Sequence, residues 1–323
     1  MTSVLVTGGA GYIGSHTAKA LKASGFEPIV LDNLFRGHRW AVQFGPLVEA
    51  DIRDTAAVRE AIRTHKVQAI IHFAALAYVG ESVTHPGLYF SNNVEGLRSV
   101  LDAAAAEHVG SVVFSSSCAT YGDPERVPVD EDCRQSPVSP YGETKLIGEH
   151  LLRWFEGACG IRSASLRYFN ASGDDPDGQL GEDHDPETHL IPSAIFAALG
   201  RRPPLDLYGT DYPTRDGTAE RDYVHVCDLA SAHVKALKYL LEGGQSVALN
   251  LGSGHGSTVR EVIAMIEAVS GRPVPHVDKP RRAGDAIALF AAADKALSVL
   301  DWQTGQSDLR TICETAWRWH SSR

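Results

Sequence analysis

Thr7-Gly8-Gly9-Ala10-Gly11-Tyr12-Ile13-Gly14 begins on the last residue of a short β-rich run, residues 3–7. It leads into a segment with an apolar stripe at helical spacing, residues 13–24. Glycines spaced in this way allow a tight turn, bring backbone N–H groups close to a pyrophosphate and let the helix pack on the strand. The next strand-like run, residues 28–31, ends on Asp32. A carboxylate there accepts hydrogen bonds from an adenosine ribose and repels a 2′-phosphate, so we expect NAD rather than NADP. The alternative is a glycine turn that binds nothing.

Strand-like and helix-like segments continue to alternate along the chain, which predicts an α/β fold with a doubly wound, Rossmann-type parallel sheet. Further strands are expected at 47–48, 69–73, 111–115, 163–168 and 247–251, and helices at 55–64, 86–107, 141–159, 190–199, 227–241 and 258–270. Gly, Asp and Pro interrupt this regularity in the remaining segments, which predicts a second, smaller mixed α/β lobe. We expect an NAD-binding domain over 1–170 plus 222–251 and a substrate-binding domain over 171–221 plus 252–323.

Composition excludes several classes of protein. The net charge of −10, from 30 basic and 40 acidic side chains, argues against binding to nucleic acid or to an anionic membrane. The five cysteines are odd in number and show no CxxC spacing, which disfavours a disulfide framework or a zinc site. No apolar run reaches the roughly 18 residues of a membrane helix, and no signal-peptide pattern opens the chain. We therefore expect a soluble cytoplasmic protein.

Ser139-Pro140-Tyr141-Gly142-Glu143-Thr144-Lys145 contains a Tyr-x-x-x-Lys pattern, which places Tyr141 and Lys145 on one face of a helix. A neighbouring ammonium favours the phenolate, and a free phenol with a pKa of about 10 needs such help to act as a base. Ser117 lies near the end of the preceding strand, where a hydroxyl could reach a substrate oxygen. A solvated surface pair and a capping serine are the alternatives.

Four stretches carry a family resemblance: TGGAGYIGSH (7–16), SPYGETK (139–145), GTDYPTRDGTAERDY (209–223) and RRAGD (281–285). They resemble the extended short-chain dehydrogenase/reductases, and among these the UDP-glucose 4-epimerase group, from Val4 to about Trp302. The resemblance implies a homodimeric NAD enzyme that acts on a UDP-sugar. It also implies that Tyr141 is the base, that Lys145 lowers its pKa and holds the nicotinamide ribose, and that Ser117 bridges the sugar hydroxyl.

The same resemblance assigns two sets of binding residues. The cofactor set is Gly8, Gly11, Tyr12, Ile13, Asp32, Asn33, Asp51, Ile52, Phe73, Ala74, Asn92, Tyr141, Lys145 and Tyr168. The substrate set is Ser117, Tyr141, Asn170, His189, Leu190, Tyr208, Arg221, Tyr223, Arg282, Asp285 and Leu289. Arg side chains suit a pyrophosphate and Asp suits ribose hydroxyls, in agreement with these positions. For Asp51, an ordinary role at the start of a helix is the alternative.

The activity expected from the resemblance is interconversion of UDP-glucose and UDP-galactose through a 4-keto intermediate. Ala77-Tyr78 and Leu289 depart from the common pattern, so UDP-xylose and UDP-arabinose are alternative substrates, and acceptance of N-acetylated sugars stays open. A 4,6-dehydratase would need an acid/base pair where Cys118 and Ala119 stand. A non-catalytic NAD-binding sensor would not need the Tyr141–Lys145 pair.

Asp183-His184-Asp185, together with His189, could be taken for a metal cluster. Hard-metal sites need converging oxygens and zinc prefers His and Cys, so we expect a solvated loop instead. We predict no metal site.

Overall fold

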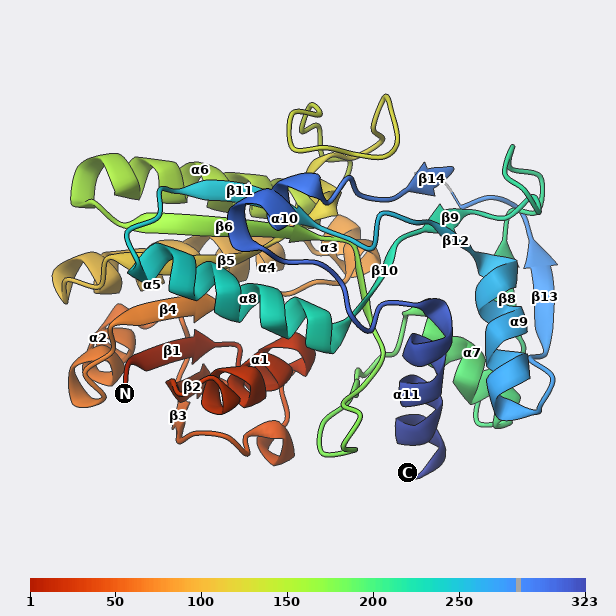
Figure 1. Cartoon of the computed structure of the whole chain (residues 1–323), viewed down its shortest axis with the longest axis horizontal. Coiled ribbons are helices and arrows are strands. Elements are labelled where there is room, and N and C mark those ends of the chain that lie inside the picture. Colours follow the sequence, from red (N-terminus) through yellow and green to blue (C-terminus); the bar gives the residue numbers. More distant parts are fainter. Residues whose placement is uncertain (283–285) are drawn as a thin grey trace.

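The computed structural model describes residues 1–282 and 286–323. A seven-stranded sheet forms its larger part, in the order β11-β6-β5-β4-β1-β2-β3, and every neighbouring pair is parallel (Figure 1). The strands are β1 (Ser3–Thr7), β2 (Glu27–Asp32), β3 (Leu47–Glu49), β4 (Ala69–His72), β5 (Ser111–Ser117), β6 (Arg162–Tyr168) and β11 (Val247–Leu251). The chain order reverses at β1, which lies between β2 and β4. The predicted doubly wound sheet is confirmed, and such sheets bind ligands at the carboxyl ends of the strands beside this reversal.

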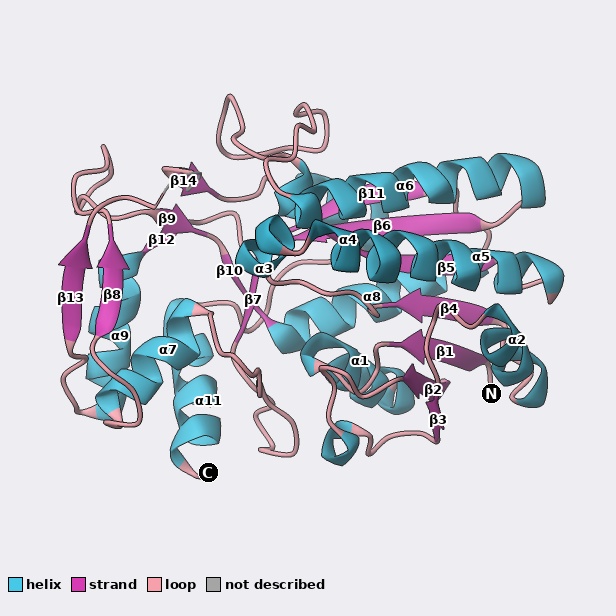
Figure 2. Cartoon of the chain, turned by 180° about the vertical axis from the view of Figure 1, so that it is seen from behind, coloured by secondary structure: helices cyan, strands magenta, loops and turns pink. Residues whose placement is uncertain are grey.

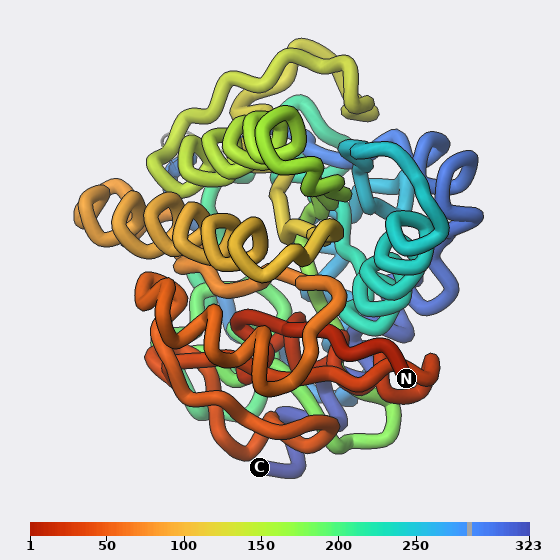
Figure 3. Tube along the Cα trace, turned by 90° about the vertical axis from the view of Figure 1, so that its left-hand side faces the viewer, coloured from red at the N-terminus to blue at the C-terminus, as the bar shows by residue number. Residues whose placement is uncertain are grey.

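Helices cover both faces of the sheet because each carries one apolar face. On one side lie α1 (Tyr12–Ala23) and α8 (Val226–Leu241), and on the other α2 (Thr55–Thr64), α5 (Gly96–Ala106) and α6 (Pro140–Cys159) (Figure 2). Two buried apolar clusters, one on each face, hold these three layers together. The view along the strands shows α5 and α6 on one side of the sheet and α8 on the other (Figure 3). We call this part the sheet lobe.

The second lobe is smaller and mixed, as predicted. It contains α7 (Leu190–Ala198), α9 (Val259–Ser270), α11 (Leu309–Ser321) and the parallel pair β8 (Leu205–Tyr208) and β13 (His276–Lys279), at the right of Figure 1. Its helices share an apolar core of their own. Short strands connect the lobes: β7 (Asn170–Ser172) with β10 (Tyr223–His225), and β9 (Glu220–Arg221) with β12 (Ser257–Thr258) and β14 (Ala288–Leu289).

The predicted helix over 86–107 is observed as three joined pieces. They are α4 (Pro86–Tyr89), a π-helix (Phe90–Glu95) and α5. Also present, but not predicted, are α3 (Val79–Thr84), α10 (Asp294–Leu300), α11 and the 3-10 helices Arg39–Ala41 and Cys118–Thr120. Among the described residues, no helix is long and apolar enough to cross a membrane.

Candidate active site

Glycine stands at each of three positions in the first loop for a different structural reason. Gly8 has φ +72°, and a Cβ there would stand 2.5 Å from the Ala74 nitrogen. A Cβ on Gly14 would stand 2.3 Å from the Gly8 carbonyl oxygen, so Gly14 sets the close packing of α1 on β1. Gly11, the residue before α1, is less crowded, although a Cβ there would still make a tight contact of 3.3 Å with the Gly8 oxygen. This division of roles fits a loop that admits a pyrophosphate at the N-terminus of α1.

Asp32 lies at the carboxyl end of β2 and is turned toward this loop. Its carboxylate accepts the Ala10 N–H at 3.0 Å and the Leu34 N–H at 2.8 Å. Burial raises the pKa of Asp32, and the two N–H donors oppose the rise. The carboxylate therefore joins the glycine loop to the end of β2, which is the position predicted for a ribose contact.

Asp51 does not cap a helix, so the alternative expected for it does not hold. Asp54 caps α2 instead, accepting from Ala56 and Ala57. The Arg53 guanidinium donates to both carboxylate oxygens of Asp51, at 2.9 and 2.6 Å, and these bonds lower the pKa of Asp51 to about 2. Asn33 donates to the same carboxylate at 3.3 Å. Two of the predicted cofactor residues, Asn33 and Asp51, are thus in direct contact.

Tyr141 and Lys145 share one face of α6, whose first turn Ser139 caps by accepting from the Gly142 N–H at 3.2 Å. The Lys145 amine is buried, donates to the Ser115 carbonyl at 2.7 Å and lies 5.9 Å from the centre of the Tyr141 ring. Burial lowers the pKa of Lys145 to about 7. Burial also raises the pKa of Tyr141 to about 12, although the Ser117 hydroxyl opposes that rise. Protein groups alone therefore keep the phenol protonated.

Ser117 is the last residue of β5, and its Oγ accepts the Ala119 N–H at 3.1 Å. Ser117 is therefore a capping serine, which was the alternative to a catalytic role. The bond uses only an acceptor site of the hydroxyl, so the hydroxyl proton can still be donated. Tyr168, at the end of the adjacent strand β6, is hydrogen-bonded through its hydroxyl to Ser115. The parallel register thus brings Ser117 and Tyr168 side by side at the carboxyl edge of the sheet.

The predicted substrate residues lie on the strands between the lobes and in the second lobe. Asn170 on β7 donates to the Asp222 carbonyl at 3.0 Å, and Tyr223 begins the paired strand β10. Arg221 on β9 is in register with Leu289 on β14. Leu289 packs in an apolar cluster that includes Cys118, the residue after Ser117, so β14 lies close to the catalytic edge.

The other predicted residues are placed as follows. Arg282 stacks on Tyr208, 4.3 Å from its ring centre, while Asp285 lies outside the described residues. Ile52 is buried against Gly96. Phe73 and Ala74 follow β4, and both of their N–H groups donate hydrogen bonds to the Thr7 carbonyl. Tyr12 and Ile13 begin α1, and Asn92 lies in the π-helix, where it donates to Asn93 at 3.0 Å.

A glycine loop with an acidic strand end, and a Tyr–Lys pair beside a strand-end serine, are thus gathered along one edge of a parallel sheet. A family model for the NAD dependent epimerase/dehydratase family matches residues 4–252. The chain belongs to this family.

Three relatives with full-length similarity are described as UDP-glucose 4-epimerases. UDP-glucose 4-epimerase of Rhizobium meliloti (strain 1021) is 54% identical over 321 residues, covering 99% of this chain and 98% of that protein. The crystal structure of UDP-glucose 4-epimerase from Brucella ovis in complex with NAD has a TM-score of 0.97 at 53% identity and 98% coverage of both chains. UDP-glucose-4-epimerase from Stenotrophomonas maltophila, with bound NAD and formylated UDP-arabinopyranose, has a TM-score of 0.96 at 39% identity, covering 100% of this chain and 98% of that chain.

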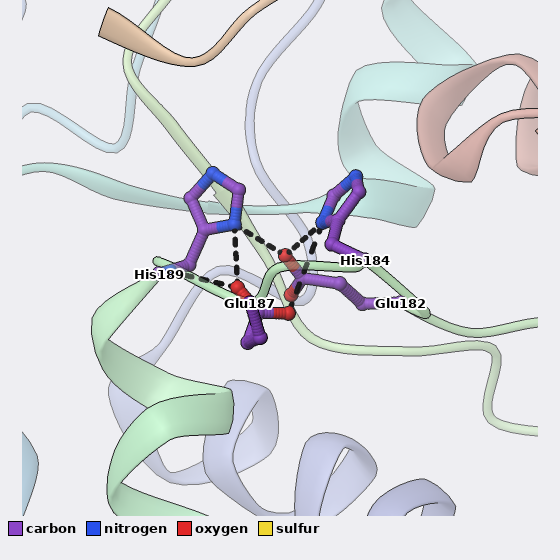
Figure 4. Close-up of side chains that lie close together, drawn as sticks. All are labelled: Glu182, His184, Glu187 and His189. Atoms are coloured by element: carbon purple, nitrogen blue, oxygen red, sulfur yellow. Dashed lines mark hydrogen bonds and ion pairs between the residues drawn. The ribbon is translucent and has the colours of Figure 1, made fainter. Parts of the chain in front are cut away.

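The loop before α7 differs from its prediction as a solvated segment. Glu182, His184, Glu187 and His189 turn toward one another (Figure 4), and the side chains of Glu182 and Glu187 are only 4% and 7% exposed. His189 is the residue before α7, and Leu190 is the first residue of that helix. Burial lowers the pKa of His189, but Glu182 and Glu187 outweigh it and raise the value to about 10. Asp183 and Asp185, named with the histidines in the sequence, are not part of this cluster.

Asn93 is a supporting residue that the sequence did not single out. Its buried amide accepts from the Leu76 N–H at 2.8 Å, donates to the Leu76 carbonyl at 3.0 Å, and donates to the Thr144 hydroxyl at 3.0 Å. Thr144 lies between the two members of the Tyr–Lys pair, so Asn93 fixes α6 against the segment after β4. The adjacent asparagines Asn92 and Asn93 in the sequence could have indicated a supporting amide. Only the π-helix of the structure shows which of the two side chains turns inward.

Proposed function

We propose that the protein is a UDP-sugar 4-epimerase that uses NAD and interconverts UDP-glucose and UDP-galactose. The observation that carries the proposal is the convergence of Tyr141, Ser117 and Lys145 at the sheet edge beside the glycine loop. The descriptions of the family members at 54% and 53% identity support it. A homodimer, a cytoplasmic location and the division into domains at 170/171, 221/222 and 251/252 are part of the proposal and rest on the resemblance.

The residues fit NAD in two places. The glycine loop and the first turn of α1 would hold the pyrophosphate, and Asp32 would accept from the adenosine ribose. Lys145, whose amine reaches Ser115 of β5, and Tyr168, at the end of β6, would lie along the nicotinamide half. When bound, NAD supplies a group that accepts a hydride from the sugar and later returns it.

Side chains of the protein carry out the proton transfer. Tyr141 accepts the proton of the sugar 4-hydroxyl and gives it back once the carbonyl carbon has been reduced from its other face. Ser117 donates its free proton to the same oxygen, since its acceptor site is already used by the Ala119 N–H. Arg221, Arg282 and Asn170 hold the UDP, so binding energy remote from C4 keeps the 4-keto intermediate in place while its sugar ring turns.

The environment of Cys118 disfavours a dehydratase. That reaction needs an acid and a base after the strand-end hydroxyl residue, and Cys118 and Ala119 stand there. Burial raises the pKa of the Cys118 thiol to about 12, so it is not a base near neutral pH. Ala119 offers no ionisable group at all.

Pentose substrates are the second candidate, since one similar structure holds formylated UDP-arabinopyranose. Leu289, which packs against the same apolar cluster as Cys118, is of intermediate size for a residue that limits the sugar pocket. We expect measurable turnover of both UDP-galactose and UDP-arabinose, and a kcat/KM for UDP-N-acetylglucosamine at least about tenfold lower, because a pocket mismatch of this kind costs about 1–3 kcal/mol.

The test compares kcat/KM on the three sugars with the purified chain and no added reductant. A Leu289→Cys variant is the matched comparison, since it enlarges the pocket without adding charge and should improve the acetylated sugar. No change in any of the three sugars overturns the proposal. A wild-type preference for the acetylated sugar overturns the role given to Leu289 and leaves the epimerase assignment standing.

A further inference from the structure

The cluster of Glu182, His184, Glu187 and His189 has no part in the proton transfer described above. It lies in the loop between β7 and α7, and one atom from each side chain lies within 4.8 Å of the corresponding atoms of the other three. Figure 4 shows both imidazoles turned with Nδ1 toward the two carboxylates. Two imidazole nitrogens and two carboxylates form a ligand set that zinc can bind, since His nitrogen and carboxylate oxygen are both zinc ligands.

The distances show convergence on one point rather than separate pairs. Glu182 Oε1 lies 2.9 Å from His184 Nδ1 and 2.8 Å from His189 Nδ1. His189 Nδ1 is also 3.0 Å from Glu187 Oε1, and His184 Nδ1 is 3.8 Å from Glu187 Oε2. A single Nδ1–H can serve only one acceptor well, whereas four ligands about 2.0–2.1 Å from a tetrahedral ion stand roughly 3.3 Å apart. The distances of 2.8–3.8 Å, which cover four of the six ligand pairs, bracket that separation, and all the pairs lie within 4.8 Å.

The charges of the cluster also favour a cation. The carboxylates of Glu182 and Glu187 are nearly buried, and a third buried carboxylate, Asp174, accepts the Glu182 N–H at 2.6 Å. Like charges held together in a buried site repel one another unless positive charge is present, whether from an imidazolium or from a bound cation. Two carboxylates and two neutral imidazoles neutralise one divalent ion completely.

We propose that Glu182, His184, Glu187 and His189 bind one divalent transition-metal ion, with Zn²⁺ as the best chemical match. All four ligands come from the chain, which is the arrangement of a structural site rather than a catalytic one. The ion fastens the loop over the sheet lobe. His184 packs edge-on against Tyr12 of α1 and against Tyr78, at 6.0 Å in each case, and the Asp185 carbonyl accepts from Arg36 at 2.6 Å.

The test loads the full-length protein with metal alone, at about pH 8, where an incoming ion can displace the remaining imidazole protons. Protein stripped with a chelator is titrated with Co²⁺ and then with Zn²⁺, and metal content is measured by mass spectrometry. We expect one ion per chain, the visible absorption bands of tetrahedral Co²⁺, their loss on adding Zn²⁺, and a melting temperature that rises with free metal concentration.

Two variants and one control locate the site. His184→Ala and Glu187→Gln each remove one ligand and should weaken Co²⁺ binding by at least about tenfold. Asp183→Asn is the control, since that residue is adjacent in sequence but outside the cluster, with its carboxylate 3.8 Å from His38 Nε2, and the variant should bind as the wild type does. Circular dichroism confirms that each variant is folded.

Folded wild-type protein that takes up no Co²⁺ or Zn²⁺ would overturn the proposal and leave the four residues as an ion-pair network. Unchanged binding in both ligand variants would also overturn it, because the metal would then lie elsewhere.

Discussion

At the scale of single residues, Tyr141 and Lys145 show what spacing can and cannot predict. The i, i+4 spacing places them on one helix face, as expected. The lowered phenol pKa expected from that spacing is not produced by protein groups, because burial raises the pKa of Tyr141 to about 12 and lowers that of Lys145 to about 7. The positive charge that ionises the phenol has to arrive with the cofactor.

We predict that bound NAD lowers the apparent pKa of Tyr141 by several units. A cationic nicotinamide ring favours the phenolate, so the sign of the shift is downward. The measurement is the phenolate absorbance of the wild type minus that of Tyr141→Phe, which cancels the other tyrosines, recorded across pH with and without NAD. Identical titrations in the two states would contradict a cofactor-driven activation.

At the scale of elements, α6 packs closely against β5 and the residues that follow it. A Cβ on Gly142 would stand 2.4 Å from the Ala119 carbonyl oxygen, and one on Gly148 would stand 2.6 Å from Phe114. One turn beyond Lys145, Glu149 forms a buried ion pair with Arg167 of β6 at 2.6 Å. These contacts fix where the Tyr141 hydroxyl stands relative to Ser117.

Gly142→Ala should therefore damage catalysis more than folding. The new methyl group pushes the first turn of α6 away from Ala119, and a shift of about 1 Å at the reacting groups costs about 100-fold in rate. We expect kcat to fall by one to two orders of magnitude (on the order of 10- to 100-fold) with a small change in KM.

Gly157→Ala is the matched control on the same helix, because a Cβ there meets nothing within 4 Å. It should keep full activity and raise stability by about 0.5–1 kcal/mol. Equal kinetics in the two variants would show that the close approach of Gly142 has no catalytic role.

The elements that could be predicted are those whose signal is local. Thr55–Thr64 and Val247–Leu251 were predicted to the residue, because apolar periodicity and flanking turn residues define them. The pairing of β8 with β13 could not be predicted, since it joins distant segments and His276–Lys279 is exposed along its whole length. The same limit applies to the four-residue cluster before α7, which only the course of the loop brings together.

At the scale of the whole molecule, the segment after β7 folds back over the cofactor loop. The Tyr12 hydroxyl donates to the Gly173 carbonyl, and Lys19 of α1 binds Asp175 at 2.7 Å and Asp177 at 2.7 Å. The start of α1 therefore contacts both the proposed NAD site and the chain that leads to the second lobe. Under the proposed function, cofactor and UDP-sugar are held from different lobes and meet only at the sheet edge.

The central claim is a reversible oxidation at C4 with Tyr141 as the proton shuttle, and NMR in D₂O tests it most directly. The purified chain is incubated with UDP-galactose, and the reverse reaction starts from UDP-glucose. The account predicts the same mixture from both sides, without deuterium on any sugar carbon, and loss of nearly all turnover in Tyr141→Phe with NAD still bound. An unchanged sugar, a dehydrated 4-keto product carrying solvent deuterium, or near-normal turnover in Tyr141→Phe would contradict it.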